Sequence, residues 1–169
     1  MKKLTLVSFI FLLMTTFVLA QKEKEPSFSD YRVKAERITA KQPNLASNKN
    51  ARMYRTNLRN AAKEGVNFAG HYVLAWWGCG TSCIEAAIID ARTGKVFFPS
   101  VLQGVGAGFC DLPDNVETLD FKPNSRLLIL SGFKGADQNQ PDGKCGIYYF
   151  EWTGTDFKQI KYVPKKSTL

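Results

Sequence analysis

Residues 71–90 read HYVLAWWGCGTSCIEAAIID, and this stretch decides the fold. Apolar runs on either side of a Gly-rich turn predict two strands, 71–77 and 84–90. In the second strand, every position from residue 86 to residue 89 is apolar, and successive side chains point to opposite faces of a strand. A strand that is apolar on both faces is normally covered on both faces. We therefore expect the sheet to curl on itself, or a helix to cover its second side.

Further strands are predicted on the C-terminal side of this hairpin. They span 95–98, 116–121, 126–131, 147–152 and 157–162, the last four as two hairpins around polar turns. On the N-terminal side, a helix is predicted from Ser47 or Asn48 to about Glu64, with Gly65 as its stop. The fold class is therefore α+β and mostly β. We expect an antiparallel sheet of about seven strands, curled or sandwiched, with one N-terminal amphipathic helix packed on it.

The predicted helix has two unlike sides. Its apolar side contains Leu58 and is expected to lie on the sheet. Its basic side contains Arg52, Arg55 and Arg59. Outside the cytoplasm, such a face attracts anionic polymers, whereas a nucleic-acid partner is not expected there. A solvated surface that aids solubility is the alternative interpretation.

The first 20 residues have the pattern of a signal peptide. Lys2 and Lys3 precede an apolar run that ends at Ala20, where cleavage is predicted. The run is shorter than the roughly 20 residues that a spanning helix needs, and no later segment approaches that length. We expect residues 21–46 to be a basic flexible leader and residues 47–169 to be a single disulfide-stabilised globular domain. The expected location is periplasmic or secreted, with no transmembrane span after cleavage.

All four cysteines follow the predicted signal peptide. An even number in an oxidising compartment predicts two disulfides. The favoured pairs are Cys79–Cys83, across a tight turn, and Cys110–Cys145, which would contribute roughly 3–4 kcal/mol by closing a long loop. A crossed pairing stays open. The spacing is not that of a zinc site and His71 is the only histidine, so neither a metal nor a cofactor is predicted.

Four short motifs occur along the chain, each of them once. They are NFAGHY at 67–72, WGCGTSC at 77–83, IDARTGKV at 89–96 and CGIYY at 145–149. Together they resemble a family of bacterial exported proteins of unassigned activity, in which an Arg-rich helix leads into a Phe-Ala-Gly-His-Tyr strand and a Trp-Gly-Cys-Gly-Thr-x-Cys turn. The resemblance implies an extracytoplasmic bacterial domain and implies no activity.

One pair of residues could carry thiol chemistry. His71 and Cys83 faintly resemble the histidine and cysteine of L,D-transpeptidases, which act on cell-wall peptides. A thiolate nucleophile needs a base within hydrogen-bond reach. The sequence departs from that pattern: Ser82 directly precedes the cysteine, the spacing is shorter, and no arginine follows. If Cys83 is oxidised, there is no nucleophile.

Aromatic residues supply the leading hypothesis. Trp76 and Trp77 are adjacent in a strand, so one is expected in the core and the other, with Tyr72, in an exposed platform for a sugar or peptide. The expected contact patch consists of His71, Trp76 and Trp77. Burial of both is the alternative. We expect a non-enzymatic binding domain of the bacterial envelope or exterior, whose partner is an envelope component or an exported protein. Two alternatives remain, a Cys/His thiol enzyme acting on cell-wall peptides and an inhibitor or immunity protein.

Overall fold

Two antiparallel β-sheets form most of the structure. The computed structural model describes residues 24–135 and 144–167, so the predicted signal peptide lies outside the described residues. The strands are β1 (Tyr72–Gly80), β2 (Cys83–Asp90), β3 (Val96–Phe97), β4 (Gln103–Val105), β5 (Leu119–Phe121), β6 (Leu127–Gly132), β7 (Gly146–Trp152) and β8 (Phe157–Pro164). The helices are α1 (Arg55–Glu64) and two short 3-10 turns, η1 (Phe28–Tyr31) and η2 (Ser100–Leu102).

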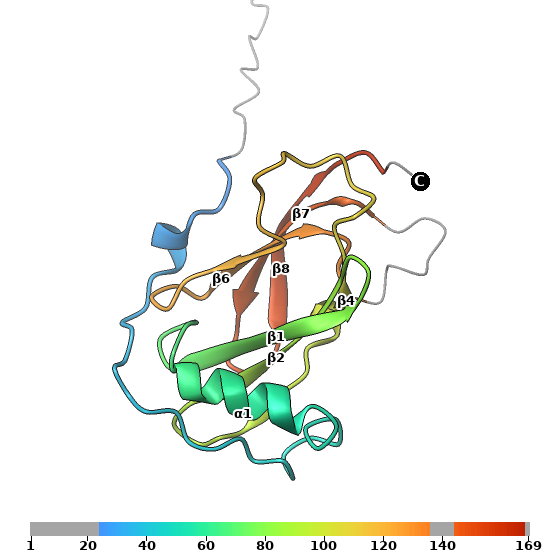
Figure 1. Cartoon of the computed structure of the whole chain (residues 1–169). Helices are drawn as coiled ribbons and strands as arrows, with labels where there is room; N and C mark the ends of the chain where they lie inside the picture. Colours follow the sequence, from blue (N-terminus) through green and yellow to red (C-terminus); the bar gives the residue numbers. More distant parts are fainter. Residues whose placement is uncertain (1–23, 136–143, 168–169) are drawn as a thin grey trace, which may run out of the picture.

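The strands divide into two four-stranded sheets instead of one sheet of about seven strands. The first has the order β1-β2-β3, with β4 also paired to β2, and the second has the order β5-β6-β7-β8. The sheets are joined where Gly106, just after β4, exchanges backbone hydrogen bonds with Phe133, just after β6, at 3.2 and 2.6 Å. The short β4 lies in a Gly-rich segment for which the sequence predicts a loop. Figure 1 shows α1 on the outside of the first sheet, with the second sheet behind it.

The two faces of β2 contribute to two separate cores. Ala86 and Ile88 pack in a cluster with Leu128 and Phe150 from the second sheet. Ala87 and Ile89 pack in another cluster with residues of α1, including Leu58. The apolar residues on both faces of this strand are thus covered, one face by a sheet and the other by a helix.

Residues 24–46 lie along the domain, in contrast to the expected flexible leader. Backbone hydrogen bonds join Val33 to Asn124 at 2.9 Å and Lys41 to Ala91 at 2.9 Å. The hydroxyl of Tyr149, on β7, donates to Glu25 at 3.1 Å. This N-terminal segment (residues 24–46) therefore contacts both sheets and is part of the packed structure (Figure 1).

Local differences from the sequence expectations occur at element ends. The helix begins at Arg55, because residues 47–54 form turns. β1 continues through Gly80, so its turn to β2 contains only Thr81 and Ser82, the latter with a φ of 53°. Among the described residues, no helix is both long and apolar enough to cross a membrane.

Both favoured disulfides are present. They join Cys79 to Cys83 and Cys110 to Cys145. All four cysteines lie within the described ranges, and none is free. Two disulfides are typical of proteins that work in an oxidising, exported environment.

Candidate functional site

The predicted binding residues lie in separate places. Tyr72 is the first residue of β1 and His71 precedes it, whereas Trp76 lies about 13 Å further along the strand, at 3.3 Å per residue. Trp77 points to the opposite face from Trp76. Arg52, Arg55 and Arg59 are exposed, in or just before α1. The contact patch predicted from His71, Trp76 and Trp77 is therefore divided between a pocket at His71 and a groove at Trp76, and the basic flank of α1 is a further surface.

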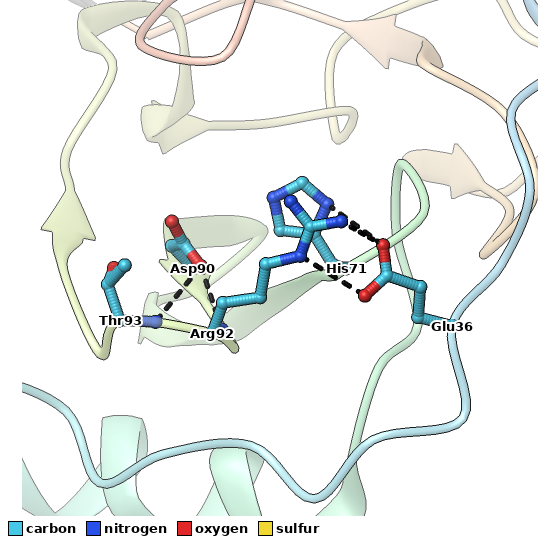
Figure 2. A network of polar contacts seen from close by, with 5 residues as sticks. All are labelled: Glu36, His71, Asp90, Arg92 and Thr93. Atoms are coloured by element: carbon cyan, nitrogen blue, oxygen red, sulfur yellow. Dashed lines mark hydrogen bonds and ion pairs between the residues drawn. The ribbon is translucent and has the colours of Figure 1, made fainter.

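His71 belongs to a network that holds the N-terminal segment. Its Nδ1 lies 3.9 Å from Oε1 of Glu36. The same carboxylate accepts from Nε of Arg92 at 3.1 Å and also from its terminal nitrogen. Asp90 in turn accepts from the backbone N–H groups of Arg92, at 2.8 Å, and Thr93, at 3.2 Å. Figure 2 shows the side chains of Arg92 and His71 both directed at the carboxylate of Glu36, so this network connects the N-terminal segment to the first sheet.

A pocket of about 470 Å³ lies beside this network. Its wall includes Tyr72 and Trp152, whose rings meet edge to face with centroids 5.4 Å apart. Burial raises the pKa of the Tyr72 hydroxyl. Arg126 and Glu151 line another side and form an ion pair at 2.8 Å. Of the other charged residues that line this pocket, Glu36 is paired with Arg92 and Lys34 adds a positive charge.

Trp77 has a structural role. Its ring centroid lies 4.6 Å from that of Tyr54, and its Nε1 donates to Glu85 at 3.2 Å. It packs against the core between the first sheet and α1. A hydrogen bond to Glu85 raises the pKa of Tyr54. Of the two adjacent tryptophans, Trp77 therefore belongs to the packed interior.

Trp76 is the exposed tryptophan, with 59% of its surface accessible. It lines a groove of about 230 Å³ between α1 and the outer edge of β1. The polar residues along this groove (hereafter the Trp76 groove) are Asn57, Asn60, Glu64 and Asn67. An aromatic surface beside amide and carboxylate groups suits a ligand that has both apolar and hydrogen-bonding parts.

The sequence analysis missed the polar side of this groove. Asn57, Asn60 and Glu64 follow one another at helical spacing, so they share one flank of α1. Arg55, Arg59 and Lys63 occupy another flank, roughly 140° away at 100° per residue. This flank could have been found from the sequence, because the asparagines and the arginines of the predicted helix fall on different sides at helical spacing. The groove and the basic flank are therefore distinct surfaces.

The arrangement holds no thiol nucleophile. Cys83 is oxidised, and it pairs with Gly80 at the turn of the β1–β2 hairpin. His71 precedes Tyr72, which pairs with Asp90 at the opposite end of that hairpin. The imidazole and the sulfur are thus separated by the length of a strand. Nor do the described residues contain a cluster of His, Cys, Asp or Glu side chains that could hold a metal ion.

Comparison with known proteins adds no relative. No protein-family model, curated protein or solved structure matches the chain. The interpretation of the site therefore depends on its geometry.

Proposed function

We propose that the protein is a non-enzymatic binding domain of the bacterial envelope or exterior, exported by its N-terminal signal peptide. Its ligand, an envelope component or a segment of an exported protein, occupies the Trp76 groove. The observation that carries this proposal is the exposure of Trp76 at the outer edge of β1, where amide side chains of α1 line the same groove from the other side of the strand. Large aromatic side chains are enriched where proteins bind ligands, because they offer a large contact area at a small entropic cost.

The chemistry of the described residues also supports binding over catalysis. All four cysteines are oxidised, and the carboxylate beside His71 is engaged by Arg92. A thiol enzyme would need reduction of the Cys79–Cys83 disulfide and a large movement that brings His71 and Cys83 together. The basic flank of α1 adds a weak attraction to anionic polymers.

The proposal is tested by titrating the mature protein with soluble cell-wall fragments, a polyanion and a peptide library while the indole N–H signal of Trp76 is followed by NMR. A ligand is expected to shift this signal, and Trp76→Ala is expected to weaken binding by about tenfold or more. Met53→Ala is the matched control, because Met53 is also exposed, at 73%, but lies outside the groove. Equal binding by both variants would disprove the assignment of the site.

A further inference from the structure

Along the outer edge of β1, the outward backbone groups of the first half of the strand are hydrogen-bonded, whereas those of the second half are not. Tyr72 exchanges backbone hydrogen bonds with Phe68 at 2.9 and 3.0 Å. The side chain of Asn67 then replaces a neighbouring strand at Leu74: its Oδ1 accepts from the backbone N–H at 2.7 Å, and its Nδ2 donates to the carbonyl at 3.1 Å. Alternate residues of an edge strand direct their backbone groups away from the sheet. The next two residues of this series are Trp76 and Gly78.

The outward backbone groups of Trp76 and Gly78 have no partner among residues 24–135 and 144–167. The pairing with β2 stays regular as far as Gly78, so both residues keep the outward orientation of Leu74. Both are exposed, and no lysine, proline or charged residue occurs from Trp76 to Gly80. Native proteins usually protect a free edge with such residues. This edge instead presents unpaired donors and acceptors at Trp76 and Gly78, at the spacing of a β-strand, up to the β-bulge between Gly78 and Gly80.

The surroundings of this edge form a trough with two unlike walls. Val73 and Ala75 face α1, whereas Leu74 faces the second sheet. Trp76 therefore shares a face with Leu74, on the side of the sheet away from the helix. On the other side, Asn57 and Asn60 of α1 line the groove above the strand. A strand added at this edge would have Trp76 beside one of its faces and the amides of α1 above the other.

A second copy of the chain does not fit this edge. Pairing β1 with β1 of another molecule would place both α1 helices on the same face of the joined sheet. Each helix lies over the edge strand, so the two would meet where an added strand needs room. A single extended chain carries no such helix and does not have this problem.

We infer that the open edge of β1 binds an extended polypeptide segment of a partner as an additional strand, a refinement that rests on the proposed function of the Trp76 groove. Main-chain hydrogen bonds to Trp76 and Gly78 supply affinity, and pockets for alternate side chains supply specificity. The segment has an apolar or aromatic residue opposite Trp76. Its neighbouring residues are polar, because they face Asn57, Asn60 and Glu64.

The test starts with a displayed library of random ten-residue peptides, selected on the mature protein with its disulfides intact and counter-selected on Trp76→Ala. The selected peptide is then the probe. We expect it to slow hydrogen exchange at the backbone amides of Trp76 and Gly78. We also expect Gly78→Pro, which removes an outward N–H, to weaken binding by about tenfold, with Gly78→Ala within about twofold. The alanine has room, because the nearest heavy atom to its Cβ would lie 4.0 Å away.

N-methylation of the selected peptide tests the same hydrogen bonds without a change in the protein, in case Gly78→Pro misfolds. N-methylation of the peptide residue opposite Trp76 should also weaken binding by about tenfold, whereas N-methylation of the adjacent residue, whose N–H points away, should not.

Each other outcome overturns the inference. Failure to select any peptide that distinguishes the protein from Trp76→Ala contradicts it, as does peptide binding without amide protection at the edge. Protection that appears without peptide and grows with protein concentration would assign the edge to a second copy. If a cell-wall fragment shifts the Trp76 indole but leaves these amides unprotected, the inference fails and the proposed function survives. If nothing shifts the indole, both fail.

Discussion

Arg92 and Glu36 form a two-point ion pair across 56 residues of sequence. Arg92 follows β2, and Glu36 belongs to the N-terminal segment. The guanidinium hydrogen bonds lower the pKa of the Glu36 carboxyl, and the carboxylate raises the pKa of Arg92. This pair is the side-chain link between the segment and the first sheet that Figure 2 displays.

This ion pair predicts an acid-sensitive contribution to stability. Because the pKa of Glu36 in the folded protein lies below its usual value of 4.5, the stabilisation is present above that pH and is lost as the pH falls through the folded pKa. We expect the urea midpoint of the native protein to fall more steeply below about pH 4.5 than that of Glu36→Gln. Glu117→Gln, a change at an exposed carboxylate, should keep the native slope. Identical slopes for the native protein and Glu36→Gln would contradict the role of the pair.

The two adjacent tryptophans should respond differently to truncation. Trp77→Ala removes the ring contact with Tyr54 and the hydrogen bond to Glu85, and should cost about 2–4 kcal/mol of unfolding free energy. Trp76→Ala should change stability by no more than about 0.5 kcal/mol, because the side chain is largely exposed. Guanidinium denaturation followed by circular dichroism measures both. A larger loss for Trp76→Ala would show that this tryptophan is structural.

The two disulfides should contribute unequally. The Cys110–Cys145 bond joins residues 35 apart, whereas the Cys79–Cys83 bond joins residues 4 apart. In the chain-entropy model, paired substitution with alanine should cost about 4 kcal/mol for the first and about 2 kcal/mol for the second. Unfolding midpoints of the two double variants test this order. Equal losses would indicate that the short bridge also constrains the native hairpin.

Tyr149 predicts a loss of stability at alkaline pH. Burial, followed by the hydrogen bond to Glu25, raises the pKa of its hydroxyl to about 12. The unfolded state ionises near pH 10, so the stabilisation is complete below that pH and is lost as the pH rises toward 12. Tyr149→Phe should lose about 1 kcal/mol at neutral pH and show a shallower alkaline decline than the native protein. An unchanged decline would assign the pH dependence to other groups.

The basic flank of α1 predicts salt-sensitive binding to polyanions. Replacement of Arg52, Arg55 and Arg59 by glutamine should leave the unfolding free energy nearly unchanged, because all three are exposed. It should weaken binding to polyglutamate at low salt, and the difference should diminish as salt screens the charges. Binding of the peptide selected on the Trp76 groove should be unaffected. Loss of peptide binding as well would show that the two surfaces act together.

Local patterns predicted much of the fold. The two-sided apolar character of residues 86–89 required cover on both faces of β2, and the structure has it. The division into two sheets was not predictable, because the alternation within a strand does not say which other strands it pairs with. β4 was missed because three residues in a Gly-rich segment have no readable alternation.

The candidate site was only partly predictable. Strand alternation places Trp76 and Trp77 on opposite faces, but it does not say which face the helix covers. That choice depends on Leu58 and Ala62, which dock α1 over Val73 and Ala75. The open edge of β1 was not predictable either, because the closure at Leu74 is made by the side chain of Asn67 and not by a strand.

The course of the N-terminal segment sets an order of events in folding. Glu25 meets Tyr149 at a separation of 124 residues, and the carbonyl of Lys24 accepts from Lys161 at a separation of 137. These contacts cannot form until β7 and β8 have left the ribosome. Contacts between distant residues also close slowly. The start of the segment is therefore expected to be among the last parts to dock, and a chain that emerges N-terminus first cannot complete its fold until its last strand arrives.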